Sequence, residues 1–331
     1  MSDTARRVFV AIVIAYLVSL LLILLGSYVM PRPEARGVLR TLFGLLLFPS
    51  LILFPLSALL RRGRLALPLA PAVIVWMVVF GMLLLPRSPN APQGAARFTI
   101  LTFNVQTATE NLDSLAALIR AADADIVALQ ELSAPAAAFL GEALADLYPE
   151  QALHPQEVPN WGQGILTRFP LLANEFWRNE QIEVAQGHMW AQIEIAGQAV
   201  TVFSTHPVPP LSFEKGLTLQ QHSREIAILL ERAAQHDTPQ LLVGDFNMTE
   251  LMDEYQRVTE RYVDTFRQAG SGGLGFTFPA GQRLPLPPVI RIDYIFHTDE
   301  FQGLNAYPLA RSSESDHLPF WAELAFSPED G

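Results

Sequence analysis

Two short polar strings near the C-terminal end of the chain carry the residue types of a hydrolytic site. Gly244-Asp245-Phe246-Asn247 follows the apolar run Gln240 to Val243, and Ser315-Asp316-His317 follows a serine-rich turn. Side chains at i and i+2 of a strand share a face, so Asp245 and Asn247 would converge on one point. A carboxylate there can take a proton from water, and a neutral amide can hydrogen-bond a phosphate. Taken alone, the first string is equally consistent with a strand and a polar turn.

Two histidines at strand ends have the chemistry for proton transfer or for stabilising phosphoryl charge. His317 precedes the expected strand 320–326, and Asp293, on the polar face of the alternating run 291–296, is the candidate that orients it. His206 ends another strand-like run and fits phosphate contact or protonation of a leaving group. For either histidine alone, an ordinary loop position is the simpler interpretation. The other histidines, His154, His188, His222, His236 and His297, have no such partners in the sequence.

Asn104 and Glu131 supply oxygen donors at the ends of two further strands, 98–105 and 126–129. If these strands are neighbours, both side chains lie at one sheet edge. Mg²⁺ prefers oxygen ligands and binds through one or two carboxylates plus substrate phosphate, so this sparse set suits it. The chain has no cysteine, and no two histidines have zinc-ligand spacing. A solvated strand end is the plainer explanation for Glu131 considered by itself.

The elements that must position these residues form a strand-rich region with interspersed helices. Helical periodicity marks 112–122 and 217–234, and 270–288 reads as a loop rich in glycine and proline. This mixture predicts an α/β sandwich. The expected strands are 98–105, 126–129, 164–167, 189–195, 199–204, 240–243, 291–296 and 320–326.

The first part of the chain contains three apolar runs, 8–30, 41–60 and 65–85, each long enough to cross a hydrocarbon core. We therefore expect a membrane anchor of three transmembrane helices over 1–86, and 87–96 as a linker. A cleavable signal peptide is the alternative for the first run, whose apolar stretch is long for one and is followed by no small-residue cleavage site. Pro49 and Pro55 leave a re-entrant hairpin open for the second.

Charge bears on both topology and partners. Arginines divide evenly between the two sides of the expected helices, but the dense turn 61–64 favours that turn and the N-terminus inside. Ten of the 22 basic residues lie in 1–97 with only Asp3 and Glu34, which leaves 12 basic against 31 acidic residues beyond them. A domain with a net charge of −19 lacks the excess of basic residues that nonspecific binding of a polyanion requires.

The ordered motifs of residues 97–327 resemble the endonuclease/exonuclease/phosphatase superfamily, which includes deoxyribonuclease-like and apurinic endonucleases, inositol polyphosphate 5-phosphatases and neutral sphingomyelinases. Two features depart from particular members: the acidic charge differs from apurinic endonucleases, and no clear 5-phosphatase substrate signature is present. The motifs are Phe103-Asn104-Val105, Leu129-Gln130-Glu131, Gly164-Ile165-Leu166-Thr167-Arg168-Phe169-Pro170, Thr205-His206, Gly244-Asp245-Phe246-Asn247, Ile292-Asp293-Tyr294 and Ser315-Asp316-His317.

The resemblance implies a four-layer α/β sandwich, with two packed mixed β-sheets flanked by helices, preceded here by the three transmembrane helices. It implies a role for each motif residue. Glu131 would be the main ligand of Mg²⁺, or Mn²⁺, assisted by Asn104 and Asp316. Asp245 would activate water, Asn247 would hold phosphate, and His317, oriented by Asp293, would stabilise the reacting phosphorus. His206 would contact the scissile phosphate, and Arg168 and Phe278 are the candidate substrate-binding residues.

These observations predict a membrane-anchored, Mg²⁺-dependent phosphoester hydrolase, in the inner membrane of a bacterium with its catalytic domain in the periplasm. A lipid or small-molecule phosphodiester is favoured over nucleic acid, because the domain is acidic and tethered. The alternatives are a tethered nuclease acting on DNA or RNA, and an inactive membrane scaffold that keeps the fold. Besides the phosphoester substrate and the bilayer, the sequence indicates no obligate protein partner.

Overall fold

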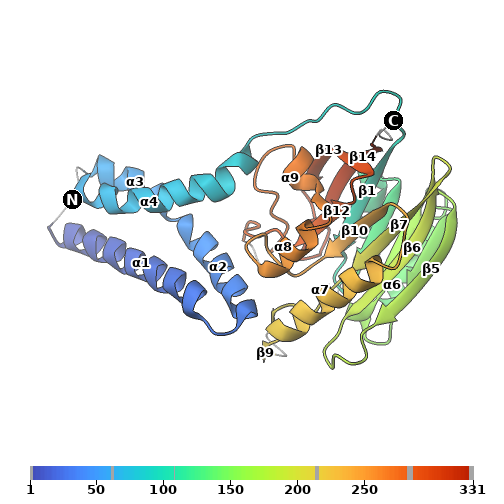
Figure 1. The fold of residues 1–331 in the computed structure, drawn as a ribbon, viewed down its shortest axis with the longest axis horizontal. Helices are drawn as coiled ribbons and strands as arrows, with labels where there is room; N and C mark the ends of the chain where they lie inside the picture. The colour runs from blue at the N-terminus through green and yellow to red at the C-terminus, as the bar shows by residue number, and fades with distance from the viewer. Residues whose placement is uncertain (1–2, 61–62, 108, 213–215, 282–285, 328–331) are drawn as a thin grey trace. The chain divides into compact units, whose positions relative to one another are not determined.

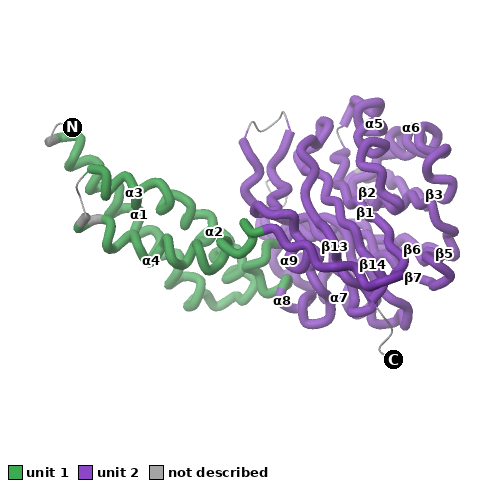
Figure 2. The backbone as a smooth tube through the Cα atoms, turned by 90° about the horizontal axis from the view of Figure 1, so that it is seen from above, with its two compact units in different colours: residues 1–85, 249–255 green, residues 86–248, 256–331 purple. Residues whose placement is uncertain are grey.

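The computed structural model describes residues 3–60, 63–107, 109–212, 216–281 and 286–327. The chain divides into two compact units (Figure 2). Unit 1 comprises Met1–Leu85 with Thr249–Tyr255, and unit 2 comprises Pro86–Met248 with Gln256–Gly331. The arginine turn that favours one membrane orientation includes Arg61 and Arg62, which lie outside the described residues.

Unit 1 is built from apolar helices. They are α1 (Asp3–Val29), α2 (Pro33–Leu47), α3 (Ser50–Leu59), α4 (Gly63–Phe80) and the 3-10 turn η1 (Gly81–Leu84). Three stretches, Thr4–Val29, Pro33–Leu59 and Ala66–Leu84, are long and apolar enough to cross a membrane. The second begins earlier than the expected 41–60 and is interrupted where Pro49 caps α3, because proline cannot donate the backbone hydrogen bond that would continue α2.

Unit 2 contains two mixed six-stranded sheets with helices on their outer faces (Figure 1), which confirms the predicted sandwich. The first sheet has the order β13-β14-β1-β2-β4-β3, and the second has the order β11-β12-β10-β7-β6-β5. The strands of the first sheet are β1 (Arg97–Asn104), β2 (Ile126–Gln130), β3 (Glu150–His154), β4 (Gln163–Thr167), β13 (Phe301–Pro308) and β14 (Phe320–Phe326). Those of the second are β5 (Leu171–Arg178), β6 (Gly187–Ile195), β7 (Gln198–Thr205), β10 (Gln240–Asp245), β11 (Val263–Asp264) and β12 (Asp293–His297).

Helices cover the outer faces of the sheets. The amphipathic helix α5 (Leu112–Ala122) packs Leu115 and Ile119 into a core with Phe103 and Leu129 of the first sheet. On the other side, α7 (Leu219–Ala233) buries an apolar face. The remaining elements are α6 (Ala134–Ala143), η2 (Pro159–Trp161), α8 (Asp253–Thr259), α9 (Thr265–Ala269) and the short pair β8 (Leu211–Ser212) and β9 (Gly216–Leu217).

Strand direction brings the predicted polar residues to one end of the sandwich. β1 runs parallel to β2, with Asn104 opposite Gln130, and β10 runs parallel to β7, with Gly244 opposite Thr205. We call this the carboxyl end and the other the amino end. β12 is antiparallel to β10, so Asp293, its first residue, lies opposite Asp245 at the carboxyl end.

A fully buried polar layer joins the two sheets beneath the carboxyl end. Gln130 accepts a hydrogen bond from Thr102 and donates one to Ser204 across the sheet interface, at 3.2 and 3.0 Å. Ser204 in turn donates to Gln163 at 2.8 Å. A buried polar group destabilises the fold unless it is hydrogen-bonded. This network is fully hydrogen-bonded only when the two sheets pack in this alignment, so it favours that alignment.

Candidate active site

Backbone geometry after β10 aims Asp245 and Asn247 into the carboxyl end. A Cβ on Gly244, whose φ is 138°, would lie 2.1 Å from the Thr205 carbonyl oxygen, so glycine is required where β10 approaches β7. Asn247 has a left-handed φ of 49°, and its backbone N–H donates to Asp245 Oδ1 at 2.9 Å. Its side-chain amide donates to the Pro207 carbonyl at 3.0 Å. The two side chains therefore converge, as the sequence predicts.

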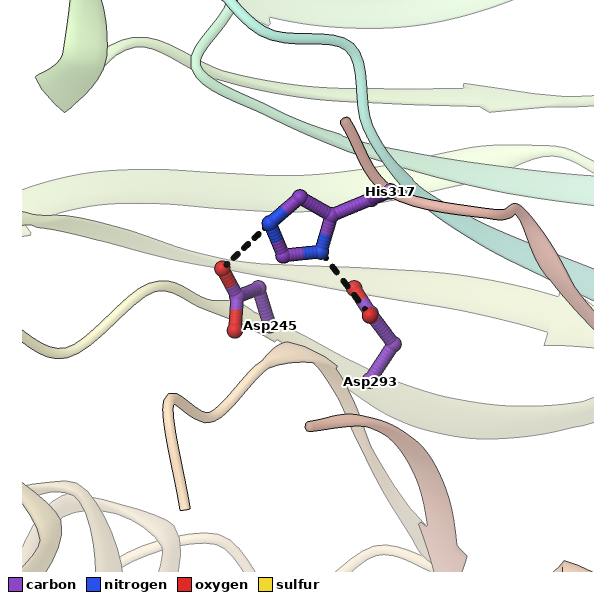
Figure 3. A group of neighbouring side chains, drawn as sticks. All are labelled: Asp245, Asp293 and His317. Atoms are coloured by element: carbon purple, nitrogen blue, oxygen red, sulfur yellow. Dashed lines mark hydrogen bonds and ion pairs between the residues drawn. The ribbon is translucent and has the colours of Figure 1, made fainter. Parts of the chain in front are cut away.

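His317 lies between two buried carboxylates (Figure 3). Its Nδ1 is 2.9 Å from Asp293 Oδ2, and its Nε2 is 3.6 Å from Asp245 Oδ2. Ser315 fixes the backbone here, because its hydroxyl accepts from the His317 N–H and donates to the Asn104 carbonyl. The predicted pairing of His317 with Asp293 is present, and it leaves Nε2 facing the site.

The charges around this histidine alter its proton affinity. Burial alone lowers the pKa of His317, but the negative charges of Asp293 and Asp245 outweigh burial and raise it to about 10. Burial raises the pKa of Asp245, and the charge of Asp293 adds to this effect while His317 and His206 oppose it. An imidazolium beside a carboxylate of increased basicity is an arrangement that can donate one proton and accept another.

A second group of side chains lies beside Asp245. Asn104 donates its amide N–H groups to Glu131 Oε1 and Asp245 Oδ2, both at 3.1 Å. His206 Nε2 is 3.5 Å from Asp245 Oδ2 and 3.7 Å from Glu131 Oε1. Burial raises the pKa of Asp316, and the charge of Glu131 raises it further. Asn104, Glu131, His206 and Asp316 thus gather from four separate segments.

The donor set suits a hard divalent cation at Glu131 and Asp316. The negative charge of Glu131 is among the causes that raise the pKa of Asp316, and a bound cation would relieve this repulsion. Asp245, Asp293 and His317 also place one ligand atom each within 4.8 Å of one another. That trio is a poorer metal site, because Nδ1 of His317 is bonded to Asp293 and its Nε2 faces Asp245, which leaves no free lone pair directed at an ion.

One predicted site residue lies elsewhere. Arg168 follows β4, which is antiparallel to β2, so it lies at the amino end, where it pairs with Asp123 and Asp125. Arg168 is therefore not among the residues that the structure brings together at the carboxyl end. Phe278, in contrast, lies in the site, with its ring centre 5.0 Å from that of His317. Arg291, a basic group near the 270–288 loop, is buried in an ion pair with Asp264.

The structure adds a residue that the sequence did not single out. Glu225 of α7 is fully buried, accepts from the backbone N–H groups of Gln186 and Val208, and lies 3.2 Å from His188 Nε2. His188 Nδ1 contacts the Thr205 hydroxyl at 2.7 Å. Glu225 therefore joins the backbone just after His206 to the residue that precedes β6. A glutamate on the apolar face of a predicted amphipathic helix was the available signal.

Comparison with known proteins decides the family. Residues 101–317 match the profile of the Endonuclease/Exonuclease/phosphatase family. The chain belongs to this family. No curated protein sequence matches the chain. Since the matched region contains most of the site, the family member is an enzyme that hydrolyses phosphoester bonds.

Solved structures share the fold of unit 2. An endonuclease/exonuclease/phosphatase from Beutenbergia cavernae DSM 12333 is 23% identical with a TM-score of 0.57, covering 70% of this chain and 72% of its own. The mannosyl-6-phosphatase Bt3783 of Bacteroides thetaiotaomicron VPI-5482 is 18% identical, with a TM-score of 0.57 over 69% of this chain and 100% of its own. A humanized D. rerio TDP2 is 18% identical, with a TM-score of 0.55 over 69% and 98%. At these identities the likeness extends to the fold alone.

Proposed function

We propose that this family member is a membrane-anchored, Mg²⁺-dependent phosphoester hydrolase. The observation that carries the proposal is the Asp293–His317–Asp245 arrangement beside Glu131, Asn104 and Asp316. It combines a proton donor, a proton acceptor and oxygen ligands at one end of the sandwich. A group of this kind suits attack of water on phosphorus.

Proton movements in the proposed reaction fall to Asp245 and His317. Asp245, with its raised pKa, accepts the proton of the attacking water. His317, kept protonated by Asp293, directs Nε2–H at charge that develops on the phosphoryl oxygens. Asn247 connects Asp245 to the 206–208 segment. His206, whose Nε2 lies 3.5 Å from Asp245 Oδ2, contacts the phosphate.

Glu131 and Asp316, assisted by Asn104, are the residues that would hold Mg²⁺, and Mn²⁺ fits the same donors. When bound there, the ion would supply Lewis-acid stabilisation of phosphoryl charge. Thr107 donates its backbone N–H to Glu131 Oε2 at 3.2 Å, which fixes the second oxygen of this ligand.

The proposed location of the enzyme is a bacterial inner membrane. The three apolar helical stretches support an anchor over 1–86, with 87–96 as a linker and 97–327 as the catalytic domain. A periplasmic catalytic domain remains our proposal, on the density of arginine at 61–64 in the sequence. A fluorescent or phosphatase reporter fused after Gly331 would report on which side the domain lies.

The test is turnover of three phosphoesters by the full chain in lipid nanodiscs with Mg²⁺: a soluble monoester, a soluble diester and supercoiled plasmid. Glu131→Gln and His317→Gln variants are measured beside it, with thermal unfolding to confirm that they are folded. Turnover that both variants lose supports the proposal, and the best substrate indicates whether the enzyme is a nuclease. Turnover that survives in both folded variants contradicts the assigned site.

A further inference from the structure

Exposed large apolar side chains in unit 2 are unevenly distributed. Among its described residues, six are strongly exposed, and five of them lie in three loops. Val158 lies in the loop before β4, Leu211 and Leu217 in the segment after His206, and Leu286 and Val289 in the loop before β12. The sixth is Leu172, on the edge strand β5.

Strand pairing places all three loops at the carboxyl end. β7 ends at Thr205, opposite Gly244, so 206–218 leaves the sheet there. β12 begins at Asp293, opposite Asp245, and β4 begins at Gln163, opposite Gln130, so the loops before them lie at that end too. The five apolar side chains are thus in the loops that border the candidate active site.

Three leucines in these loops expose more than half of their surface to solvent. Leu211 and Leu217 are 62% and 66% exposed, and they are direct partners across the β8–β9 ladder. Two hydrogen bonds from Thr218 to Pro209 and Pro210 fix the base of this hairpin. Leu286 is 59% exposed. Exposed aliphatic side chains that are concentrated in the loops at one end of a domain indicate a binding surface.

The amino end differs from the carboxyl end in its exposed apolar residues. Its turns expose acidic residues, and none of the exposed large apolar residues of unit 2 lies in the described turns between strands at this end. The exposed acidic residues there are Asp123, Glu194, Asp237, Asp299 and Glu300. Exposed carboxylates also occur in loops at the carboxyl end, where Glu110, Glu157, Glu180 and Glu183 are exposed. The feature that distinguishes the carboxyl end is therefore its exposed aliphatic side chains.

We propose that the carboxyl end of unit 2 docks on the surface of a lipid bilayer, with Leu211, Leu217 and Leu286 entering the boundary between headgroups and acyl chains. A bilayer is the natural partner because three helical stretches of this chain are long and apolar enough to cross one. Arg87, three residues beyond the end of the third stretch at Leu84, donates its backbone N–H to the Gly270 carbonyl of unit 2 at 2.8 Å.

That attachment favours the carboxyl end as the end that meets the membrane. Gly270 pairs with Ala306 of β13, two residues before Pro308, and Pro308 lies opposite Phe320. Phe320 is the first residue of β14 and pairs with Thr102 near the end of β1. The chain therefore enters unit 2 in its carboxyl half. Three residues reach at most about 10 Å, which keeps this entry point close to the bilayer.

Lipid fits this surface better than a charged partner does. The apolar residues are aliphatic, and residues beyond 97 carry 31 acidic against 12 basic side chains, so attraction to anionic headgroups cannot drive docking. Leu286 and Pro288 also form one wall of a hollow of about 830 Å³, whose other walls include Leu118, Ala121 and Leu309. Such an apolar lining suits a hydrocarbon chain. We therefore expect docking on zwitterionic lipid that is insensitive to salt.

The absence of native cysteine allows single labels for the test. Leu211→Cys, Leu286→Cys and, as the matched control, Leu172→Cys are each labelled with an environment-sensitive fluorophore in the full chain. The proteins are reconstituted in phosphatidylcholine vesicles that contain a quencher at a shallow acyl position. Quenching several-fold stronger at positions 211 and 286 than at 172 supports docking. Quenching no stronger than at 172 overturns it.

A second measurement asks whether the hairpin causes docking. In the Leu286→Cys background, Leu211→Glu with Leu217→Glu should reduce quenching at 286 to the level at 172, because charge opposes entry into the acyl region. Leu172→Glu, the control, should leave it unchanged. Unchanged quenching in the double variant would also overturn the proposal.

Docking deepens the proposed function, since it would present the site to phosphoesters at a membrane surface, but quenching requires no turnover. Hydrolysis of a soluble diester is measured on the same preparations and requires no docking. Strong quenching without hydrolysis would therefore contradict the hydrolase and leave docking intact. Hydrolysis without position-specific quenching would contradict docking and leave the hydrolase proposal intact.

Discussion

Replacement of Asp293 by asparagine separates the role of its charge from the role of its shape. Asp293 is fully buried, and its Oδ2 lies 2.9 Å from His317 Nδ1. An asparagine oxygen can still accept the hydrogen bond from Nδ1, so the ring keeps its orientation. What the variant loses is the negative charge that keeps the imidazole protonated.

The structure sets the size and direction of the effect. Loss of a positioned proton donor lowers kcat by about 10²–10⁴-fold, which corresponds to about 3–5 kcal/mol in the activation barrier. The pKa of His317, raised to about 10 in the native protein, should fall, so the alkaline limit of activity should move to lower pH. Because the pKa is raised on folding, its stabilising contribution is fully present below the ordinary value of 6.5 and is lost as pH rises through about 10. Asp293→Asn should lack this pH dependence of stability.

A second buried carboxylate provides the control. Asp264 forms an ion pair with Arg291, with side chains 2% exposed on both partners, but it lies outside the site. Asp264→Asn should destabilise the fold by about 3–5 kcal/mol, since Arg291 is left buried without its partner charge. Its kcat per folded molecule and its pH profile should match the native enzyme.

The assay is hydrolysis of a soluble phosphodiester from pH 6 to 10.5, with the folded fraction measured at each pH by thermal unfolding. Asp293→Asn with native kcat, or with an unchanged alkaline limit, would refute the assigned role of the charge. A loss of activity equal to that of Asp264→Asn at the same folded fraction would show that the effect is structural.

Three other substitutions test separate parts of the site. Glu131→Gln should raise the Mg²⁺ concentration for half-maximal activity by more than about tenfold, and an unchanged titration would remove Glu131 from the metal ligands. Glu225→Gln weakens the acceptor that holds Val208 N–H beside His206, so kcat should fall about tenfold with the Mg²⁺ titration unchanged; native kcat would count against a positioning role. Arg168→Ala should leave kcat within about twofold and lower the free energy of unfolding by at most about 1 kcal/mol, because its ion pairs are partly exposed. A large loss of kcat in the Arg168 variant would return it to the site.

The sequence predicts eight strands well because most of their side chains are buried. β1, β2, β4, β6, β7, β10, β12 and β14 all lie where apolar runs indicated them. Six strands were missed: the two-residue strands β8, β9 and β11, and the longer strands β3, β5 and β13. β3 and β5 are at the edges of their sheets, and each buries only one side chain fully, so neither has a strong apolar signal. β13 contains an irregularity between Gly303 and Asn305 that disrupts its alternation.

Local sequence does not show in which direction each strand runs, and strand direction decides which residues meet at the site. Parallel pairing brings Asn104, Glu131 and Asp245 to one end, and polar residues at strand ends were a sufficient signal for them. Arg168 also follows a strand, but β4 runs antiparallel to β2, so it lies at the other end of the sheet. Glu225 was missed for a related reason: its contact with Val208 joins a helix to a loop 17 residues away in sequence, which helical periodicity does not predict.

The most direct measurement of the central claim is metal-dependent hydrolysis of bis(4-nitrophenyl) phosphate by the full chain and by its Asp245→Asn variant. We expect turnover by the native protein that chelation abolishes and Mg²⁺ restores. In the variant we expect a loss of turnover of at least about a hundredfold, with the thermal unfolding midpoint retained. Turnover that persists in excess chelator, or native activity in folded Asp245→Asn, would contradict the assignment of this site.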